Sequence, residues 1–176
     1  GKFFSVKSVF KKNKIEFYEV INQINTSYYI DKISELNVDL IISSNSLYFG
    51  KKILDLPKLG SINRHTSLLP SYGGLWPVLQ AISHGENQVG VTIHKMTKNI
   101  DEGDILAQKV ISLEGSKNLS CIYRKAFLES STLVIEAIDN LLKNNKPITN
   151  NYLKSYFSFP NDEEWNNFRK NGGRFI

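Results

Sequence analysis

The sequence contains a single cysteine, Cys121, among 176 residues, so no disulfide can form within the chain. It also has no apolar stretch of about 18 residues, the length that a membrane-spanning helix needs. Residues 1–10 lack the apolar core of a signal peptide. These absences favour a cytoplasmic protein with no membrane partner. Cys121 falls in an apolar helical pattern, which predicts that it lies in the core.

Basic residues are present but are not gathered into a run. Lys and Arg number 22 against 17 Asp and Glu, which gives a formal charge of +5. They occur as scattered pairs, whereas a nucleic-acid-binding arm usually shows five or more basic residues together. We therefore predict no nucleic-acid partner. The positive charge is compatible with an anionic substrate and equally with a solvated basic surface.

Apolar segments of strand length alternate with segments that have helical spacing. Residues 39–43 contain the uninterrupted apolar run Leu40, Ile41 and Ile42, typical of a strand buried on both faces of a parallel sheet. A strand at 15–20 and a helix at 26–36 are predicted before it. Further strands are predicted at 61–65, 89–96 and 105–111, with helices beginning at Pro77 and spanning 119–143. The fold class is therefore α/β, with a mostly parallel sheet flanked by helices.

The chain is long enough for one well-packed domain. We assign residues 1–148 to that domain and residues 149–176 to an aromatic tail. The tail ends in a predicted short helix, 162–170, and we expect its aromatic side chains to pack on the domain.

Asn63 and His65 alternate along a predicted strand, so their side chains share one face near its carboxyl end. Open α/β sheets bind their ligands at that edge. Gly73 and Gly74 follow in a loop, and glycines let the backbone approach a ligand closely. An Asn-x-His pair alone is equally compatible with a structural role, and the adjoining loop favours a catalytic one.

An acidic connection, residues 97–104, joins the last two predicted strands. A loop in this place can bring one carboxylate, that of Asp101, to the edge of the sheet. Asp101, Glu102 and Asp104 are also hard oxygen ligands of the kind that metal ions bind, but the spacing lacks the ligand ladder of a calcium loop. We therefore predict no metal.

Two segments resemble the signatures of the folate-dependent formyltransferases, which include methionyl-tRNA, glycinamide ribonucleotide and nucleotide-sugar enzymes. Residues 63–70, Asn-Arg-His-Thr-Ser-Leu-Leu-Pro, resemble the signature Asn-x-His-x-Ser-Leu-Leu-Pro. Residues 90–106 resemble the second signature at a fitting distance. The chain end, with residues 156–160 and 172–176, is similar to short bacterial sugar N-formyltransferase-like proteins. The resemblance implies a Rossmann-like catalytic domain.

The resemblance also implies a reaction, in which 10-formyltetrahydrofolate donates its formyl group to a primary amine. Attack by the amine leaves negative charge on the formyl oxygen, and Asn63 and a protonated His65 are expected to donate hydrogen bonds to it. Donors of this kind contribute about 3 to 4 kcal/mol each. Asp101 is expected to stabilise the imidazolium and to accept the amine proton, directly or through water.

The same resemblance assigns binding residues. The expected folate-binding residues are Leu47, Phe49, Leu54, Thr97, Lys98 and Ile100, although Leu47, Phe49 and Leu54 also suit ordinary core packing. The expected acceptor-binding residues are Tyr72, Gly74 and Trp76, whose aromatic rings could equally fill their loop. His94 is expected to face the same region or to be a hydrogen-bonded core histidine, and His84 to be a surface or capping residue.

Two departures from the family bear on function. Only about 14 residues precede residue 15, so much of the family's first βαβ unit, which helps to hold the acceptor, is expected to be missing. The tail is too short for the β-barrel that contacts tRNA in methionyl-tRNA formyltransferases. The favoured acceptor is therefore a small-molecule amine on a nucleotide-linked amino sugar. A methionyl-tRNA formyltransferase-like activity, 10-formyltetrahydrofolate hydrolysis, a non-catalytic folate-binding module and a homo-oligomer are the other hypotheses.

Overall fold

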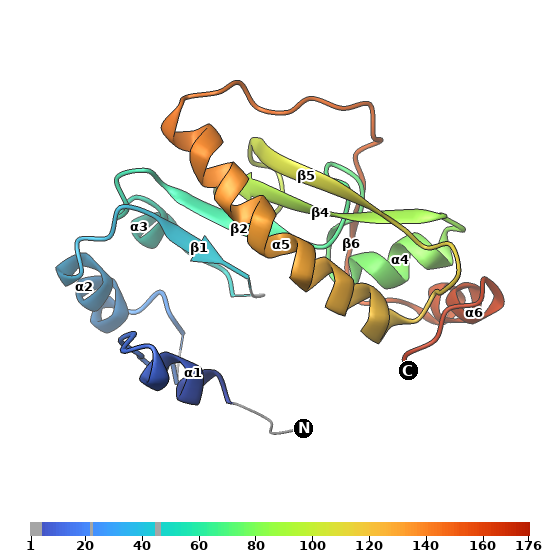
Figure 1. Ribbon diagram of the computed structural model, residues 1–176, viewed down its shortest axis with the longest axis horizontal. Helices are drawn as coiled ribbons and strands as arrows, with labels where there is room; N and C mark the ends of the chain where they lie inside the picture. Colours follow the sequence, from blue (N-terminus) through green and yellow to red (C-terminus); the bar gives the residue numbers. More distant parts are fainter. Residues whose placement is uncertain (1–4, 22, 45–46) are drawn as a thin grey trace.

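The computed structural model describes residues 5–21, 23–44 and 47–176. Within them a mixed sheet has the strand order β1, β2, β4, β5, with bounds Ile41–Ser43, Ser61–His65, Gln88–Lys95 and Ile105–Ser112 (Figure 1). β1 pairs with β2 in parallel, and β4 pairs with both β2 and β5 in antiparallel fashion. The α/β fold with flanking helices is confirmed. The β4–β5 pair is antiparallel because the short connection 96–104 turns the chain back directly from β4 into β5.

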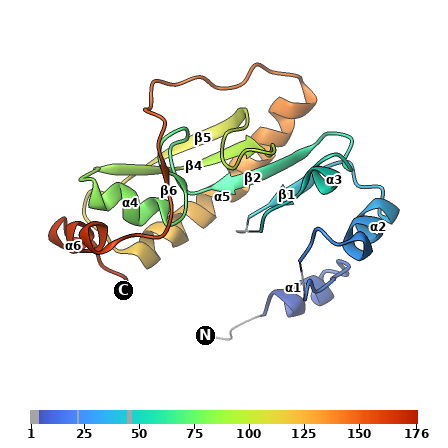
Figure 2. The ribbon, with the colours of Figure 1, turned by 180° about the vertical axis from the view of Figure 1, so that it is seen from behind.

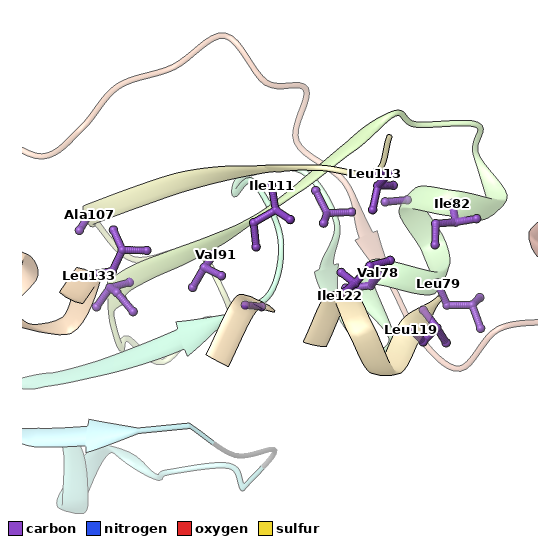
Figure 3. Close-up of a cluster of buried hydrophobic side chains, with 14 of the residues drawn as sticks. Val78, Leu79, Ile82, Val91, Ala107, Ile111, Leu113, Leu119, Ile122 and Leu133 are labelled. Atoms are coloured by element: carbon purple, nitrogen blue, oxygen red, sulfur yellow. The ribbon is translucent and has the colours of Figure 1, made fainter. Parts of the chain in front are cut away.

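Helix α5 (Leu119–Leu142) lies across one face of β4 and β5 (Figure 1). The core forms where its inward side chains meet those of the sheet and of α4 (Pro77–Ser83), as Figure 3 shows for Val91, Ile111 and Leu133. Complete burial of such a side chain contributes about 1.5 to 3 kcal/mol relative to exposure. Pro77 occupies the first turn of α4, where its missing N–H costs nothing. Both helices were predicted, and both are confirmed.

The tail returns along the sheet and packs beside α4 (Figure 2). Its strand β6 (Tyr156–Phe157) pairs in parallel with β3 (Gly73–Gly74). Helix α6 (Asp162–Lys170), confirmed at its predicted bounds, begins with a reciprocal capping box between Asn161 and Glu164. Phe168 of α6 is only 1% exposed, so the tail shares the core of the domain.

The N-terminal third contributes three further helices, α1 (Val6–Lys12), α2 (Ser27–Glu35) and α3 (Lys51–Leu54). Helix α2 confirms the predicted helix at 26–36. The strand predicted at 15–20 is wrong, because this stretch has no ladder partner within the part of the chain that is described. An alternating pattern cannot by itself supply the neighbour that a strand must pair with.

Two burial predictions are also wrong. The strand at 39–43 is not buried on both faces, since Ile42 of β1 is 52% exposed. Cys121 is exposed on α5. The helix turns its Leu119 and Ile122 side chains into the core, so the intervening Cys121 points outward.

Candidate active site

The site is built on the carboxyl end of β2 and on the adjoining strand β4. His65 is the last residue of β2, and Asn63 lies two residues earlier on the same face of the sheet. In the antiparallel register Asn63 lies opposite His94 of β4. His65 is 8% exposed and His94 is 2% exposed. The pairing of the two strands thus places one amide and two buried imidazoles side by side.

Asp101, from the connection between β4 and β5, lies between the two histidines. Its Oδ2 is 3.6 Å from Nδ1 of His65 and its Oδ1 is 3.5 Å from Nε2 of His94. The backbone N–H of Gly74 donates a hydrogen bond to Oδ2 over 2.8 Å. Asp101 has φ of 56°, a left-handed conformation that costs energy for a residue other than glycine and often occurs at functional sites. The loop geometry therefore aims the carboxylate at the histidines.

The far nitrogen of each imidazole faces a backbone carbonyl. Nε2 of His65 lies 2.9 Å from the oxygen of Tyr72, and Nδ1 of His94 lies 2.9 Å from the oxygen of Lys95. A carbonyl can only accept, so each of these nitrogens carries a proton. The nitrogen that remains on each ring therefore faces the Asp101 carboxylate.

Burial lowers the pKa of His65, because desolvation penalises the imidazolium more than the nearby Asp101 carboxylate stabilises it. For Asp101 the neighbouring groups outweigh the effect of burial on the pKa. Burial by itself raises the pKa of the carboxyl, yet the close contact with His94, the proximity of His65 and the Gly74 N–H together lower it below the usual value. At neutral pH the site therefore holds an ionised Asp101 beside a neutral His65.

Asn63 is the fourth polar side chain of the site, beside His65, His94 and Asp101. Its Nδ2 lies 3.4 Å from Nε2 of His94, while its Oδ1 is buried and has no hydrogen-bond partner. An unpaired buried acceptor costs about 1 to 3 kcal/mol. Its position beside a cavity indicates that a ligand carrying an N–H or O–H group would satisfy it.

A cavity of about 200 Å³ opens beside these side chains. Asn63, His65, His94 and Asp101 all line it. The other lining residues are Ser43, Leu47, Tyr48, Phe49, Arg64, Gly74, Leu75, Met96, Thr97, Asn99, Ile100 and Tyr156. Apolar side chains therefore form part of the wall, and Asn63, His65, His94 and Asp101 lie close together on it.

A family model described as formyl transferase matches residues 4–138. The chain belongs to this family. Over 179 residues it is 37% identical to the bifunctional polymyxin resistance protein ArnA of Wigglesworthia glossinidia brevipalpis, a match that covers 96% of this chain and 27% of ArnA. Over 112 residues it is 40% identical to the methionyl-tRNA formyltransferase of Ehrlichia ruminantium (strain Gardel), which covers 63% of this chain and 37% of that protein. The chain thus spans well under half the length of these curated relatives.

Solved formyltransferases share the fold. The formyltransferase PseJ from Anoxybacillus kamchatkensis, in complex with UDP-4,6-dideoxy-4-formamido-L-AltNAc and tetrahydrofolate, matches with a TM-score of 0.66 at 22% identity. That match covers 88% of this chain and 82% of PseJ. The phosphoribosylglycinamide formyltransferase of Bacillus halodurans gives the same TM-score at 25% identity, over 80% of this chain and 76% of that one. The Rossmann-like formyltransferase fold is thereby shown.

Most of the residues that the family resemblance singled out come together at the cavity. The structure brings together Asn63, His65, Gly74 and Asp101, with Leu47, Phe49, Thr97 and Ile100 in the surrounding wall. Leu54 and Lys98 do not line the cavity. Leu54 is half-buried on α3, and Lys98 is exposed.

The Tyr72 and Trp76 side chains lie outside this cavity. The Tyr72 ring stacks on Phe157, with centroids 5.6 Å apart, and its hydroxyl donates to Glu86. Burial and the Glu86 carboxylate raise the pKa of that phenol. Trp76 contacts Trp165 and Phe175 edge to face. At this site Tyr72 instead contributes its backbone carbonyl, which orients His65.

Several lining residues had no definite role predicted from the sequence, and His94 and Tyr156 are two of them. His94 was left open between a site role and a core role, because no local pattern shows that the register places it opposite Asn63. Tyr156 lies on β6, and an ideal Cβ on Gly74 would come within 3.1 Å of its ring. Its sequence signals were membership of an aromatic tail and of residues 156–160, which are similar to the ends of short bacterial sugar N-formyltransferase-like proteins. His84, by contrast, is exposed as predicted and bonds to the Gln80 carbonyl at the end of α4.

Among residues 5–21, 23–44 and 47–176, no group of three or more His, Cys, Asp or Glu side chains is placed to hold a metal ion. No helix within the described ranges is both long and apolar enough to cross a bilayer.

Proposed function

We propose that this chain carries the catalytic centre of an enzyme that transfers a formyl group from 10-formyltetrahydrofolate to a primary amine on a nucleotide-linked amino sugar. The observation that carries the proposal is the convergence of Asn63, His65 and Asp101 at one end of a cavity with apolar walls. Acyl transfer to an amine requires a polar group, a base and a negative charge. Asn63 supplies a polar amide, His65 a neutral base and Asp101 an ionised carboxylate.

The roles of the three residues follow from their surroundings. Asp101 is ionised and can take up the proton that the attacking amine loses, directly or through water. As that proton arrives, the adjacent His65 imidazole can become charged, and its positive charge can stabilise the oxygen that gains negative charge. Asn63 offers both ends of its amide: the unpaired Oδ1 can accept from the amine N–H, and Nδ2 can donate to the formyl oxygen.

The walls of the cavity fit the formyl donor. A pterin is flat and heteroaromatic, with edges that donate and accept hydrogen bonds. Leu47, Phe49 and Ile100 supply apolar surface, and the connection that includes Thr97 and Asn99 supplies backbone groups at the rim. These residues would hold the folate with its formyl group toward Asn63 and His65. Bound there, the folate supplies the activated one-carbon unit, and the protein supplies position and charge.

The choice of acceptor rests on the tail. The match to ArnA extends over 96% of this chain, whereas the match to the methionyl-tRNA formyltransferase covers 63%. In this chain the tail contributes Tyr156 to the cavity, and its Ser155 and Phe157 backbone carbonyls accept hydrogen bonds from the Gly73 and Leu75 N–H groups beside β3. PseJ, which shares the fold, was crystallised with a nucleotide sugar and tetrahydrofolate. A sugar acceptor therefore fits better than a tRNA, and a cytoplasmic setting stays a prediction.

Turnover with defined substrates tests the proposal. The protein is mixed with 10-formyltetrahydrofolate and a panel of nucleotide-linked amino sugars, with methionyl-tRNA and glycinamide ribonucleotide as competing acceptors. Release of tetrahydrofolate is followed spectroscopically, and the formylated product by mass spectrometry. We expect product with an amino sugar and none with methionyl-tRNA. Formylation of methionyl-tRNA alone would overturn the choice of acceptor.

A pair of histidine variants makes the test specific to the site. His65→Asn should reduce the rate about 100-fold or more, whereas His84→Asn, at an exposed histidine outside the cavity, should keep it within about twofold. Formate release without any acceptor would instead show a hydrolase that uses the same residues. Folate binding by calorimetry, with neither product, would show a binding module and contradict an enzymatic function.

A further inference from the structure

We propose that Arg64, together with the hydroxyls of Ser44 and Thr66, forms a phosphate-binding site that holds the diphosphate of a nucleotide-linked acceptor at the edge of the cavity. The inference deepens the proposed function and rests on it for the identity of the acceptor. Arg64 stands between Asn63 and His65 in the sequence and belongs to the lining of the same cavity. The anion would therefore lie next to the residues that carry the chemistry.

The Arg64 side chain is directed to the face of the sheet on which α5 packs. Neighbouring residues of a strand point to opposite faces, so Arg64 points away from the face that its two neighbours on β2 share. Its guanidinium carbon lies 4.0 Å from the centre of the Phe127 ring of α5, which is a cation–π distance. Nε donates to Oγ of Ser44 and a terminal nitrogen donates to Oγ1 of Thr66, each over 2.9 Å. The ring and the two hydroxyls thus hold the guanidinium in one orientation.

No carboxylate balances the Arg64 charge within the part of the chain that the structure describes. Arg64 is half-buried, and desolvation lowers the pKa of its guanidinium with no Asp or Glu of the described residues offsetting the effect. A guanidinium has five N–H groups, of which Ser44 and Thr66 accept one each. The other N–H groups have no acceptor among the described residues. A cation that is partly desolvated and keeps free donors gains from an anionic ligand.

The approach to Arg64 is open on the side of β1. In the parallel pairing Ile42 lies beside Ile62, which is two residues before Arg64, so all three side chains share one face of the sheet. Ile42 is 52% exposed, because α5 packs on β4 and β5 (Figure 1). Ser44, which follows β1, is exposed as well. A ligand in the cavity can therefore reach the guanidinium around the carboxyl ends of β1 and β2.

The donors at this place suit a phosphate group. The planar fork of a guanidinium matches the oxygens of a phosphate, and the Ser44 hydroxyl, which accepts from Nε, still has its own proton to donate. Among the described residues that line the cavity, Arg64 is the only Arg or Lys. The acceptor would thus place its amine at Asn63 and His65, and its phosphates at Arg64.

The charge of Arg64 also acts on His65. Burial is the largest influence that lowers the pKa of His65, and the charges of His94 and Arg64 lower it further. The Asp101 carboxylate and the Tyr72 carbonyl act in the opposite direction. A phosphate bound at Arg64 offsets the positive charge, so its arrival should raise the pKa of His65. The imidazole would then take up a proton more readily once the acceptor is in place.

Binding of phosphate-bearing probes tests the site without turnover. Calorimetry compares inorganic pyrophosphate, UDP and uridine, of which the last has no phosphate. We expect pyrophosphate and UDP to bind the wild type, with UDP at least about tenfold tighter than uridine. Equal affinities for UDP and uridine, or no binding of pyrophosphate and UDP, would contradict a phosphate site.

Substitution of Arg64 assigns that binding to its guanidinium. Arg64→Met keeps the length of the side chain and its contact with Phe127 but removes the charge, so pyrophosphate and UDP should each bind about tenfold more weakly or worse. Arg64→Lys keeps the charge and should recover part of the affinity, because an ammonium lacks the planar fork. Arg169→Met, at an exposed arginine of α6 outside the cavity, should stay within about twofold of the wild type. Urea denaturation verifies that each variant is folded.

The folate donor also carries carboxylates, so its binding is measured with the same variants. The affinity for 5-formyltetrahydrofolate should stay within about twofold of the wild type in Arg64→Met. A loss confined to the folate, with UDP and pyrophosphate unaffected, would place the carboxylates of the donor at Arg64 and overturn the proposal.

Titration of His65 separates an electrostatic role of Arg64 from a packing role. The chain has three histidines, and the ring signals of His65 in NMR spectra are those that disappear in His65→Asn. Pyrophosphate should raise the pKa of His65 in the wild type. Arg64→Met should raise that pKa without any ligand, and pyrophosphate should then have no further effect. Saturation of the wild type with pyrophosphate at an unchanged pKa of His65 would place the anion elsewhere and refute the proposal.

Turnover connects the site to the acceptor. With a nucleotide-linked amino sugar, Arg64→Met should raise the acceptor KM about tenfold or more and keep kcat and the donor KM within about threefold. With the free amino sugar, which has no phosphate, the acceptor KM should be the same in both proteins. An equal rise for the two acceptors would show a packing role and overturn the proposal. If the wild type forms no product, the proposed function fails, while pyrophosphate binding still decides whether Arg64 holds a phosphate.

Discussion

The backbone N–H of Gly74 donates a hydrogen bond to Oδ2 of Asp101, joining strand β3 to the connection that follows β4. Gly74 has φ of +90°, and an ideal Cβ there would lie 2.1 Å from the backbone oxygen of Phe157. No other residue type fits this position, because strand β6 passes directly against it. The tail, the glycine loop and the Asp101 carboxylate are thereby held together at one point.

Gly74→Ala is therefore expected to damage stability and activity together. The added methyl must displace the β6 backbone, which should cost about 2 kcal/mol or more of unfolding free energy. The displacement also moves the donor of Asp101, so kcat should fall about tenfold or more. Urea denaturation and turnover measure the two effects.

Gly85→Ala is the matched control. Gly85 has φ of +83°, close to that of Gly74, but an added Cβ meets nothing within 4 Å. Its substitution should cost only the backbone strain, about 1 kcal/mol, and leave kcat unchanged. Equal losses in the two variants would show that strain alone, and not contact with β6, explains the effect.

Asp101→Asn tests the charge of the carboxylate with little change in shape. The amide oxygen can still accept from the Gly74 N–H, but it cannot take up the amine proton. We expect kcat to fall about 100-fold or more while the dissociation constant of a folate analogue changes by less than about threefold. Glu102→Gln, one residue away, serves as the control because Glu102 pairs with Lys154 at the surface. A full rate in Asp101→Asn would remove Asp101 from the chemistry.

The elements that the sequence predicted well are those whose pattern is local. The strand at 61–65 and the helix at 162–170 have the predicted bounds, since alternation or a capping box at their ends defines them. The grouping of Asn63, His65 and Asp101 was also expected, because two signatures at a fitting distance imply it. Two residues on β2 and one loop residue sufficed.

Features that depend on distant pairing escaped prediction. The β3 and β6 strands have two residues each, which is too short for any periodicity, and they exist because Gly73 and Tyr156 meet in the fold. The place of His94 depends on its register opposite Asn63 and on a bulge in β5. Tyr72 was expected to offer its ring to a ligand, yet φ of 58° turns its carbonyl toward His65 and its ring toward Phe157.

Tyr156 is expected to contact the acceptor. Its ring is 56% exposed, lines the cavity and lies over Gly74, close to Asp101. Tyr156→Ala should raise KM for the amine acceptor about tenfold, because an aromatic ring against a sugar or base contributes about 1 to 2 kcal/mol, with little change in KM for the folate. Tyr156→Phe, which keeps the ring, should change either KM by less than about threefold.

Phe159→Ala is the control for loss of an exposed aromatic residue from the same tail. Phe159 is 72% exposed and does not line the cavity, so its substitution should leave both KM values unchanged. An increase in the folate KM for Tyr156→Ala, with the acceptor KM unaffected, would place Tyr156 on the donor side of the cavity instead.

The buried His65 and Asp101 predict how stability depends on pH. The pKa of each is lowered in the folded protein, from ordinary values of 6.5 and 3.8, so in each case the unfolded chain binds protons more readily. The stability that these groups contribute is present above the ordinary values and is lost as pH falls through the lowered ones. Below about pH 6.5 the His65 contribution should therefore decline first, with a slope of at most about 1.4 kcal/mol per pH unit.

Urea denaturation at intervals between pH 8 and pH 4 measures this slope. His65→Asn should flatten the part of the profile that begins near pH 6.5, because the variant has no imidazole to protonate on unfolding. His84→Asn, at an exposed histidine outside the cavity, is the matched control. Stability that rises as the pH falls from 6.5 to 5 in the wild type, and not in His65→Asn, would mean that folding favours the charged form of His65, contrary to the burial seen here.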